Sequence, residues 1–216
     1  MATTTLDLAR ARDRGRTGID LGRAVPGILL FVLAGQFMTA IMLAASMAPG
    51  YDMAGGAISD LGVISQTALL FNTSLVAVGI LNLAAGVVLW RRGAPGWLLG
   101  IFAFAAIGAA GAGLVPLGTS DLHSIFALVA FLFFNVQAIA CATLVTGPMR
   151  LVSILAGVVG LAFVVLMVIG DSGNPAVFGA IGHGGAERMI VYPPMLWMLA
   201  FGGALMASTS READER

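Results

Sequence analysis

The sequence contains no lysine, one cysteine and two histidines among its 216 residues. Cys141 has no second cysteine to pair with, which excludes an intramolecular disulfide and a cysteine-rich metal site. The formal net charge is zero, which argues against a nucleic-acid partner. All eleven basic residues are arginine, a bias typical of a GC-rich bacterial genome.

Charge of either sign is also scarce. Charged residues make up 10% of the chain, against about 25% in soluble domains, and 59% of the residues are hydrophobic. The mean hydropathy is +0.97. A chain of this size cannot bury so much apolar surface in its own core, so we expect lipid to be its solvent.

Six apolar runs are long enough to cross a bilayer, which takes about 20 residues each. They cover residues 25–46, 67–90, 95–115, 123–146, 150–170 and 189–208. None alternates with the period of a barrel strand. The first run is too long for the core of a signal peptide, typically about 7–15 residues. The sequence predicts an all-α, six-helix transmembrane bundle at 25–208, between an Arg-rich tail at 1–24 and a short tail at 209–216.

The arginines predict the orientation of the bundle. With six spans, ten of the eleven fall on one side, and that side should be the cytoplasm. Only Arg188 falls on the other side. We therefore expect a multi-pass protein of the plasma membrane with both termini cytoplasmic.

Polar residues gather in the three loops on the side opposite the arginines, and both histidines are among them. Ionisable groups near a bilayer usually face a bundle interior or a water-filled cavity. The candidate ligand-binding residues are Ser59, Asp60, Asn72, Asp121, His123, His183, Glu187 and Arg188.

Each candidate has a structural interpretation beside the functional one. Ser59 and Asp60 could cap a helix that begins near Leu61, and Ser120 or Asp121 could cap the fourth helix. Glu187 and Arg188 could form a local ion pair at the membrane surface, worth about 0–1 kcal/mol.

The functional interpretation takes the candidate residues together. Asp60, His123 and His183 are candidate metal ligands, and they could equally supply acid/base chemistry for hydrolysis, with Ser59 or Ser124 as nucleophile. No HExxH or GxSxG motif is present, so neither a metal nor another cofactor is assigned. Amides inside the runs, such as Asn82 and Gln137, should pair across helices for about 1 kcal/mol each.

Four stretches in this order carry a resemblance: "AISDLG", "FNTSLVAVGIL", "GAGLVPLGTSDLHSIFALVAF" and "HGGAERMIVYPPMLW". Over about residues 27–207 the chain resembles the bacterial and archaeal membrane family known as domain of unknown function 998. The resemblance implies a six-helix integral membrane protein and no particular activity. The family positions that this chain matches are Ser59, Asp60, Leu61, Gly62, Asn72, Pro116, His123, His183, Gly184 and Arg188. The family often has Gln at position 187, which weakens a catalytic role for Glu187.

The sequence therefore predicts a membrane protein with an outward-facing polar pocket for a small ligand, a lipid headgroup or an ion. The alternative is an intramembrane lipid hydrolase or transferase with an Asp/His site. A lipid enzyme should have a groove that opens sideways to the bilayer beside its acid/base groups, whereas a binding protein needs only a pocket. A transporter is disfavoured, because no charged residue is expected near the midplane.

Overall fold

The computed structural model of the protein describes residues 21–214, and within them every regular element is helical. The long helices are α2 (Leu21–Met47), α3 (Ala68–Arg91), α4 (Gly96–Leu114), α5 (Leu122–Cys141), α6 (Gly147–Asp171) and α7 (Gly182–Asp214). Three short 3-10 helices are η1 (Ile58–Gly62), η2 (Ala142–Leu144) and η3 (Pro175–Ile181). All six long helices have the length and apolar composition of a membrane span. The predicted all-α, six-span bundle is confirmed, and the protein is a multi-pass membrane protein.

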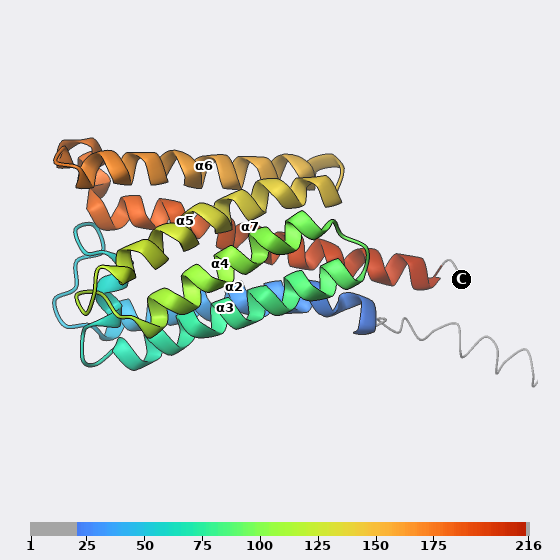
Figure 1. The fold of residues 1–216 in the computed structure, drawn as a ribbon, viewed down its shortest axis with the longest axis horizontal. Helices are drawn as coiled ribbons and strands as arrows, with labels where there is room; N and C mark the ends of the chain where they lie inside the picture. Colours follow the sequence, from blue (N-terminus) through green and yellow to red (C-terminus); the bar gives the residue numbers. More distant parts are fainter. Residues whose placement is uncertain (1–20, 215–216) are drawn as a thin grey trace, which may run out of the picture.

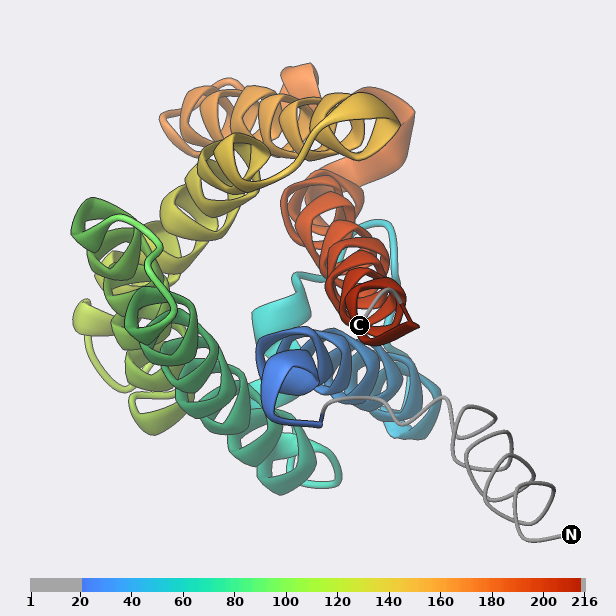
Figure 2. The same cartoon turned by 90° about the vertical axis from the view of Figure 1, so that its right-hand side faces the viewer.

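Helices that follow one another in the chain pack side by side, and α7 returns to lie against α2 (Figures 1 and 2). Among the long helices, α6 packs mainly on α5 and α7, and it also contacts η2 and η3. Small residues bring the helix backbones close: a Cβ on Gly79 of α3 would lie 2.6 Å from the carbonyl oxygen of Ala106 in α4. Such close approach is the usual packing device between membrane helices.

The predicted pairing of amides is confirmed in the bundle core. Asn82 of α3 donates to the Gln137 side-chain oxygen (2.9 Å), and Gln137 of α5 donates back to the Asn82 oxygen (3.0 Å). Asn82 also donates to the carbonyl of Phe102 in α4 (3.0 Å). Both amides are fully buried, so one reciprocal pair joins three helices.

Helix α7 begins earlier than its apolar run suggested, at Gly182 rather than near residue 189. Pro193 and Pro194 therefore lie inside the helix, where each removes an intrahelical hydrogen bond. Pro194 leaves the carbonyl of Ile190 without its helical donor, and the side chain of Asn135 in α5 donates to that oxygen (3.1 Å). The early start and the proline pair are both accommodated by contacts with other segments.

The two described ends of the chain lie at the same end of the bundle (Figure 1). The opposite end, here called the loop end, consists of residues 48–67, 115–121 and 172–181. The predicted tails cover 1–24 and 209–216; residues 1–20 and 215–216 lie outside the described part, and α2 and α7 extend over the remainder. The loop end is where the candidate site residues collect.

Candidate ligand-binding site at the loop end

Arg188 fixes the loop after α2 onto the first turns of α7. Its guanidinium is 7% exposed and donates to the carbonyls of Met53 (2.7 Å) and Gly184 (2.8 Å). It also donates to the hydroxyl of Tyr51 (2.7 Å), which in turn donates to the carbonyl of Ala57 (2.7 Å). Burial raises the pKa of the Tyr51 phenol above its usual value, although the Arg188 contact opposes the shift. Arg188 is thus engaged with the protein's own backbone.

Glu187 faces a different segment from its neighbour. Its carboxylate, on a side chain that is 5% exposed, accepts the backbone N–H of Ile58 at the start of η1 (2.5 Å). The local ion pair expected of Glu187 and Arg188 does not form, because each side chain bonds to a different part of the loop. Together the two residues hold both ends of the segment 53–58.

The glycines before these residues allow the loop to approach α7 closely. The backbone N–H of Gly184 donates to the carbonyl of Ala54 (2.8 Å). A Cβ on Gly184 would lie 2.0 Å from the carbonyl oxygen of Gly56. The stretch "GHGGAER" is therefore a docking surface for the chain's own loop, which explains why α7 begins before its apolar run.

Asp60 and Asn72 shape the turn that follows. The Asp60 carboxylate accepts the backbone N–H of Ala57 (2.8 Å), which caps η1. Asn72 donates to the carbonyl of Gly62 (2.8 Å), where a Cβ would lie 2.6 Å from the Asn72 side-chain oxygen. The capping interpretation of Asp60 is correct in kind, although the capped element is η1 and not a helix that starts near Leu61.

The remaining loop-end candidates lie nearer the surface. His183 pairs with Asp171 at the end of α6 (Nε2 to Oδ1, 3.2 Å), and the two side chains are 36% and 56% exposed. Such a pair stabilises the fold by about 0–1 kcal/mol. Asp121 is exposed and makes no capping bond to α5; Ser120 instead accepts the N–H of Leu122.

The three candidate metal ligands are not brought together. Asp60 caps η1, His183 pairs with Asp171, and His123 bonds a backbone carbonyl. Across residues 21–214, no group of three or more His, Cys, Asp or Glu side chains could hold a metal ion. The geometry thus gives the metal interpretation no support.

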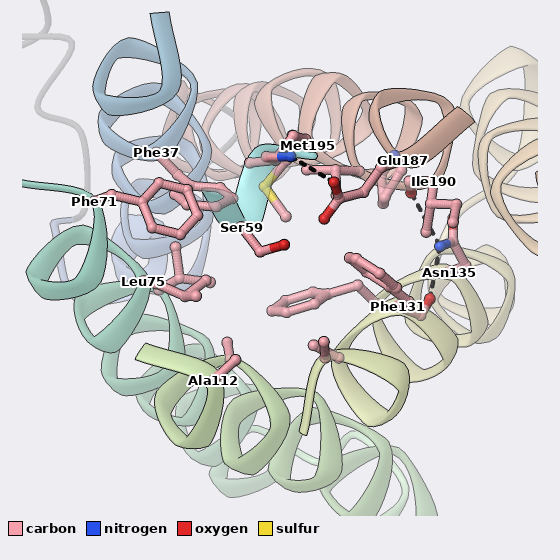
Figure 3. Close-up of a pocket in the computed structure, with 18 of the residues that line it drawn as sticks. Phe37, Ser59, Phe71, Leu75, Ala112, Phe131, Asn135, Glu187, Ile190 and Met195 are labelled. Carbon is pink, nitrogen blue, oxygen red and sulfur yellow. Dashed lines mark hydrogen bonds between the residues drawn. The ribbon is translucent and has the colours of Figure 1, made fainter. Parts of the chain in front are cut away.

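An internal cavity of about 60 Å³ lies inside the bundle beneath η1 (Figure 3). Its walls come from α2, η1, α3, α4, α5 and α7, and most are apolar, with four phenylalanines: Phe37, Phe71, Phe131 and Phe134. Four polar side chains line it: Ser59, His123, Asn135 and Glu187. From His123 to Asn135 is twelve residues along α5, or about 18 Å of helix, so the cavity reaches deep into the span.

A larger groove of about 370 Å³ lies between α5, α6 and α7 at the loop end. This volume is within the range of about 300–1,000 Å³ usual for small-molecule sites. Its rim includes Leu128 and Val168, whose side chains are about half exposed on membrane-spanning helices. The groove is therefore bordered by exposed apolar residues of membrane-spanning helices and, toward the loop end, by the exposed polar residues Asp171 and Ser172.

The groove and the cavity share one wall. The residues that line both are Ser59, His123, Ala127, Phe131, Glu187 and Ile190, and we call them the shared wall. Figure 3 shows the hydroxyl of Ser59 and the carboxylate of Glu187 directed toward the cavity. A molecule in the groove would meet these polar groups at its inner end.

On the shared wall, His123 has a buried polar atom that lacks a hydrogen-bond partner among the described residues. It is 4% exposed, and its Nδ1 lies 2.7 Å from the carbonyl oxygen of Val115. Since a carbonyl can only accept, Nδ1 carries the proton, and Nε2 of the neutral ring is an acceptor. Nε2 is buried and has no hydrogen-bond partner among the described residues. This Nε2 atom can accept a hydrogen bond from a ligand group that reaches the shared wall.

Sequence reasoning did not select Asn135, Phe131 or Ala127 as site residues. One signal could have found them: with His123 they recur every four residues along α5, which places all four on one helix face. A polar residue at each end of that face, with a small residue between, is the pattern of a lined cavity.

One comparison with known proteins places the chain in a family. A family model described as "Protein of unknown function (DUF998)" matches residues 31–204, close to the extent expected from the four motif stretches. No curated protein and no solved structure matches the chain.

Proposed function

The chain belongs to the family of unknown function DUF998, and we propose that it is a cell-membrane protein that binds an amphipathic molecule drawn from the bilayer. The ligand's apolar part would lie in the groove between α5, α6 and α7. Its polar head would reach the shared wall. This proposal refines the expected polar pocket, because exposed apolar side chains of membrane-spanning helices border the groove and the polar groups of the shared wall line it.

One observation carries the proposal. The buried, unpartnered Nε2 of His123 lies on the wall that the groove shares with the cavity. An unpaired polar atom in an apolar interior is costly, and native proteins rarely keep one without a role. A head group that donates a hydrogen bond there would remove that cost when it binds.

We further propose that the loop end faces outward. Arg91, Arg92 and Arg150 lie at the other end of the bundle. Arg188, the arginine of the loop end, is buried and bonded within the protein. This asymmetry matches the retention of arginine on the cytoplasmic side.

The proposal can be tested by blocking the groove. Ala127 contributes to the shared wall, and the larger side chain in Ala127→Phe should fill the space in front of that wall. Ala162→Phe is the matched control, because Ala162 is an exposed residue of α6 that lines neither space. The assay is photo-crosslinking in lipid nanodiscs with diazirine-bearing hexadecyl probes, followed by peptide mapping.

Labelling of α5 and α6 should be lost in Ala127→Phe and kept in Ala162→Phe. Equal labelling of the two variants, or no labelling of wild-type groove peptides by any probe, would overturn the proposal.

A second candidate function is hydrolysis of a lipid ester. It is favoured by the presence of both Ser59 and His123 on the shared wall, since an imidazole whose Nε2 has no partner can act as a general base. Asp60, which the sequence suggested for this chemistry, lines neither space. A fluorophosphonate probe should label the wild type and Ser124→Ala but not Ser59→Ala; absence of labelling in the wild type would dismiss the candidate.

A further inference from the structure

We propose that the ligand is a neutral lipid whose head is a single hydroxyl group, which donates a hydrogen bond to Nε2 of His123. This inference rests on the proposed function and specifies the class of molecule that the groove takes. Membrane lipids with a phosphate head should then not bind at this site.

The first step concerns hydrogen-bond polarity at the shared wall. His123 offers an acceptor, because its proton is committed to the Val115 carbonyl. Glu187 already accepts one backbone N–H with its Oε2 and can accept further bonds. The acceptor at His123 Nε2 favours a ligand that donates, and a fully ionised phosphate has no proton to donate.

The second step concerns charge. The titratable side chains that line the two spaces are His123, His183, Asp171 and Glu187, and none of the lining residues is an arginine. The chain has no lysine. Phosphate groups are normally bound by arginine, lysine or a metal. The site therefore lacks the groups that an anionic head would need.

The third step concerns Arg188, the nearest candidate for such a cation in the sequence. It lines neither the cavity nor the groove. Its guanidinium donates to Met53, Gly184 and Tyr51, on the loop side of α7. Releasing it toward a ligand would detach the loop, so it is not free to bind an anionic head.

The fourth step concerns the size of the polar region. Apart from Ser59, His123 and Glu187, the shared wall is Ala127, Phe131 and Ile190. A sugar or a glycerophosphoryl head carries many polar atoms, and most would be buried against these apolar side chains without partners. One hydroxyl can be fully bonded, and the alkyl chain then lies against the apolar residues of α5 and α6.

The test uses three diazirine probes with the same hexadecyl chain: hexadecanol, hexadecyl phosphate and the hydrocarbon without a head. Each is reconstituted with the wild-type protein in nanodiscs of zwitterionic lipid. We expect hexadecanol to label groove peptides about five- to tenfold more than either other probe, since one hydrogen bond distinguishes it. Excess unlabelled hexadecanol should abolish that labelling, and excess hexadecyl phosphate should not.

Two matched variants assign the contact. His123→Phe keeps an aromatic ring and removes the acceptor, so hexadecanol should fall to the level of the hydrocarbon. Tyr192→Phe removes a polar group from an aromatic side chain that lines neither space, and it should retain the preference. Because His123→Phe also loses the Val115 bond, the competition experiment on wild-type protein provides a readout that does not depend on this variant folding.

The outcomes separate the inference from the proposed function. Stronger labelling by hexadecyl phosphate, or equal labelling by the hydrocarbon, would overturn the hydroxyl assignment while groove binding stands. If no probe labels the groove, or Ala127→Phe labels like the wild type, the proposed function itself fails. A preference for hexadecanol that survives His123→Phe would also overturn the assignment.

Discussion

Substituting Gly184 by alanine should destabilise the protein by separating the loop after α2 from α7. A Cβ at this position would lie 2.0 Å from the carbonyl oxygen of Gly56 and 2.8 Å from that of Met53. Carbon and oxygen atoms in van der Waals contact lie more than 3 Å apart, so the loop must retreat by about 1 Å. That movement stretches the Gly184 bond to Ala54 and the bonds that Arg188 donates.

The magnitude follows from these losses. Overpacking by one methyl group costs about 1–3 kcal/mol, and each weakened hydrogen bond adds about 0.5–1.5 kcal/mol. Alanine recovers about 1 kcal/mol through its higher helix propensity. We expect a net loss of about 2–3 kcal/mol, which for a chain of this size lowers the melting temperature by roughly 4–12 °C.

Thermal unfolding in detergent, followed by tryptophan fluorescence, measures this change, with scan rate held constant because such unfolding is often irreversible. Gly203→Ala is the control: it lies in the same helix, and a Cβ there has no neighbour within 4 Å. Gly203→Ala should leave the melting temperature unchanged or slightly raised. If Gly184→Ala and Gly203→Ala have the same melting temperature, the close docking of the loop on α7 is refuted.

Three further predictions concern the core, the orientation and the loop. A double-mutant cycle of Asn82→Ala and Gln137→Ala should give a coupling energy of about 0.6–1.7 kcal/mol in SDS unfolding, and additivity would contradict the reciprocal amide pair. Green fluorescent protein fused after α7 should fluoresce, as expected for a cytoplasmic C-terminus, whereas a dark fusion with active C-terminal alkaline phosphatase would invert the proposed orientation. Burial raises the pKa of Tyr51, so in a Tyr192→Phe variant, where Tyr51 is the remaining tyrosine, its phenol should ionise above pH about 10. The free energy of unfolding should fall as the pH rises past about 10, because the unfolded state releases this proton first. Ionisation of the Tyr51 phenol at or below pH about 10 would contradict its burial.

The sequence was sufficient to predict the fold because the lipid environment leaves few choices. Six apolar runs separated by short connections can form only a helical bundle. The long helices begin and end within a few residues of the predicted runs, apart from both ends of α7 and the end of α5. The start of α7 was the larger miss: residues 182–188 are polar and glycine-rich, which favours a loop. They are helical because the loop at 53–58 docks on them and satisfies their backbone and charges.

The site was only partly predictable. The sequence drew attention to the polar residues of the loop end, but charge and residue type do not reveal which way a side chain faces. Arg188 and Asp60 bond the protein's own backbone, whereas His123 lines the cavity. The groove depends on the separation of α5 from α6 and α7, and no local pattern encodes that distance.

The matched family positions divide into supports and candidate contacts, and the division changes how binding variants should be interpreted. Asp60 and Asn72 hold η1 and the turn after it, and η1 places Ser59 on the shared wall. Loss of binding in Asp60→Ala would therefore report a displaced wall and not a lost contact, and it should be accompanied by loss of stability. Asp60→Asn keeps a side-chain oxygen that can accept the Ala57 N–H, so it should bind the hexadecanol probe like the wild type. A residue that touches the ligand behaves differently: Ser59→Ala breaks no bond within the described protein, so any change in probe labelling that it causes at unchanged melting temperature belongs to the ligand.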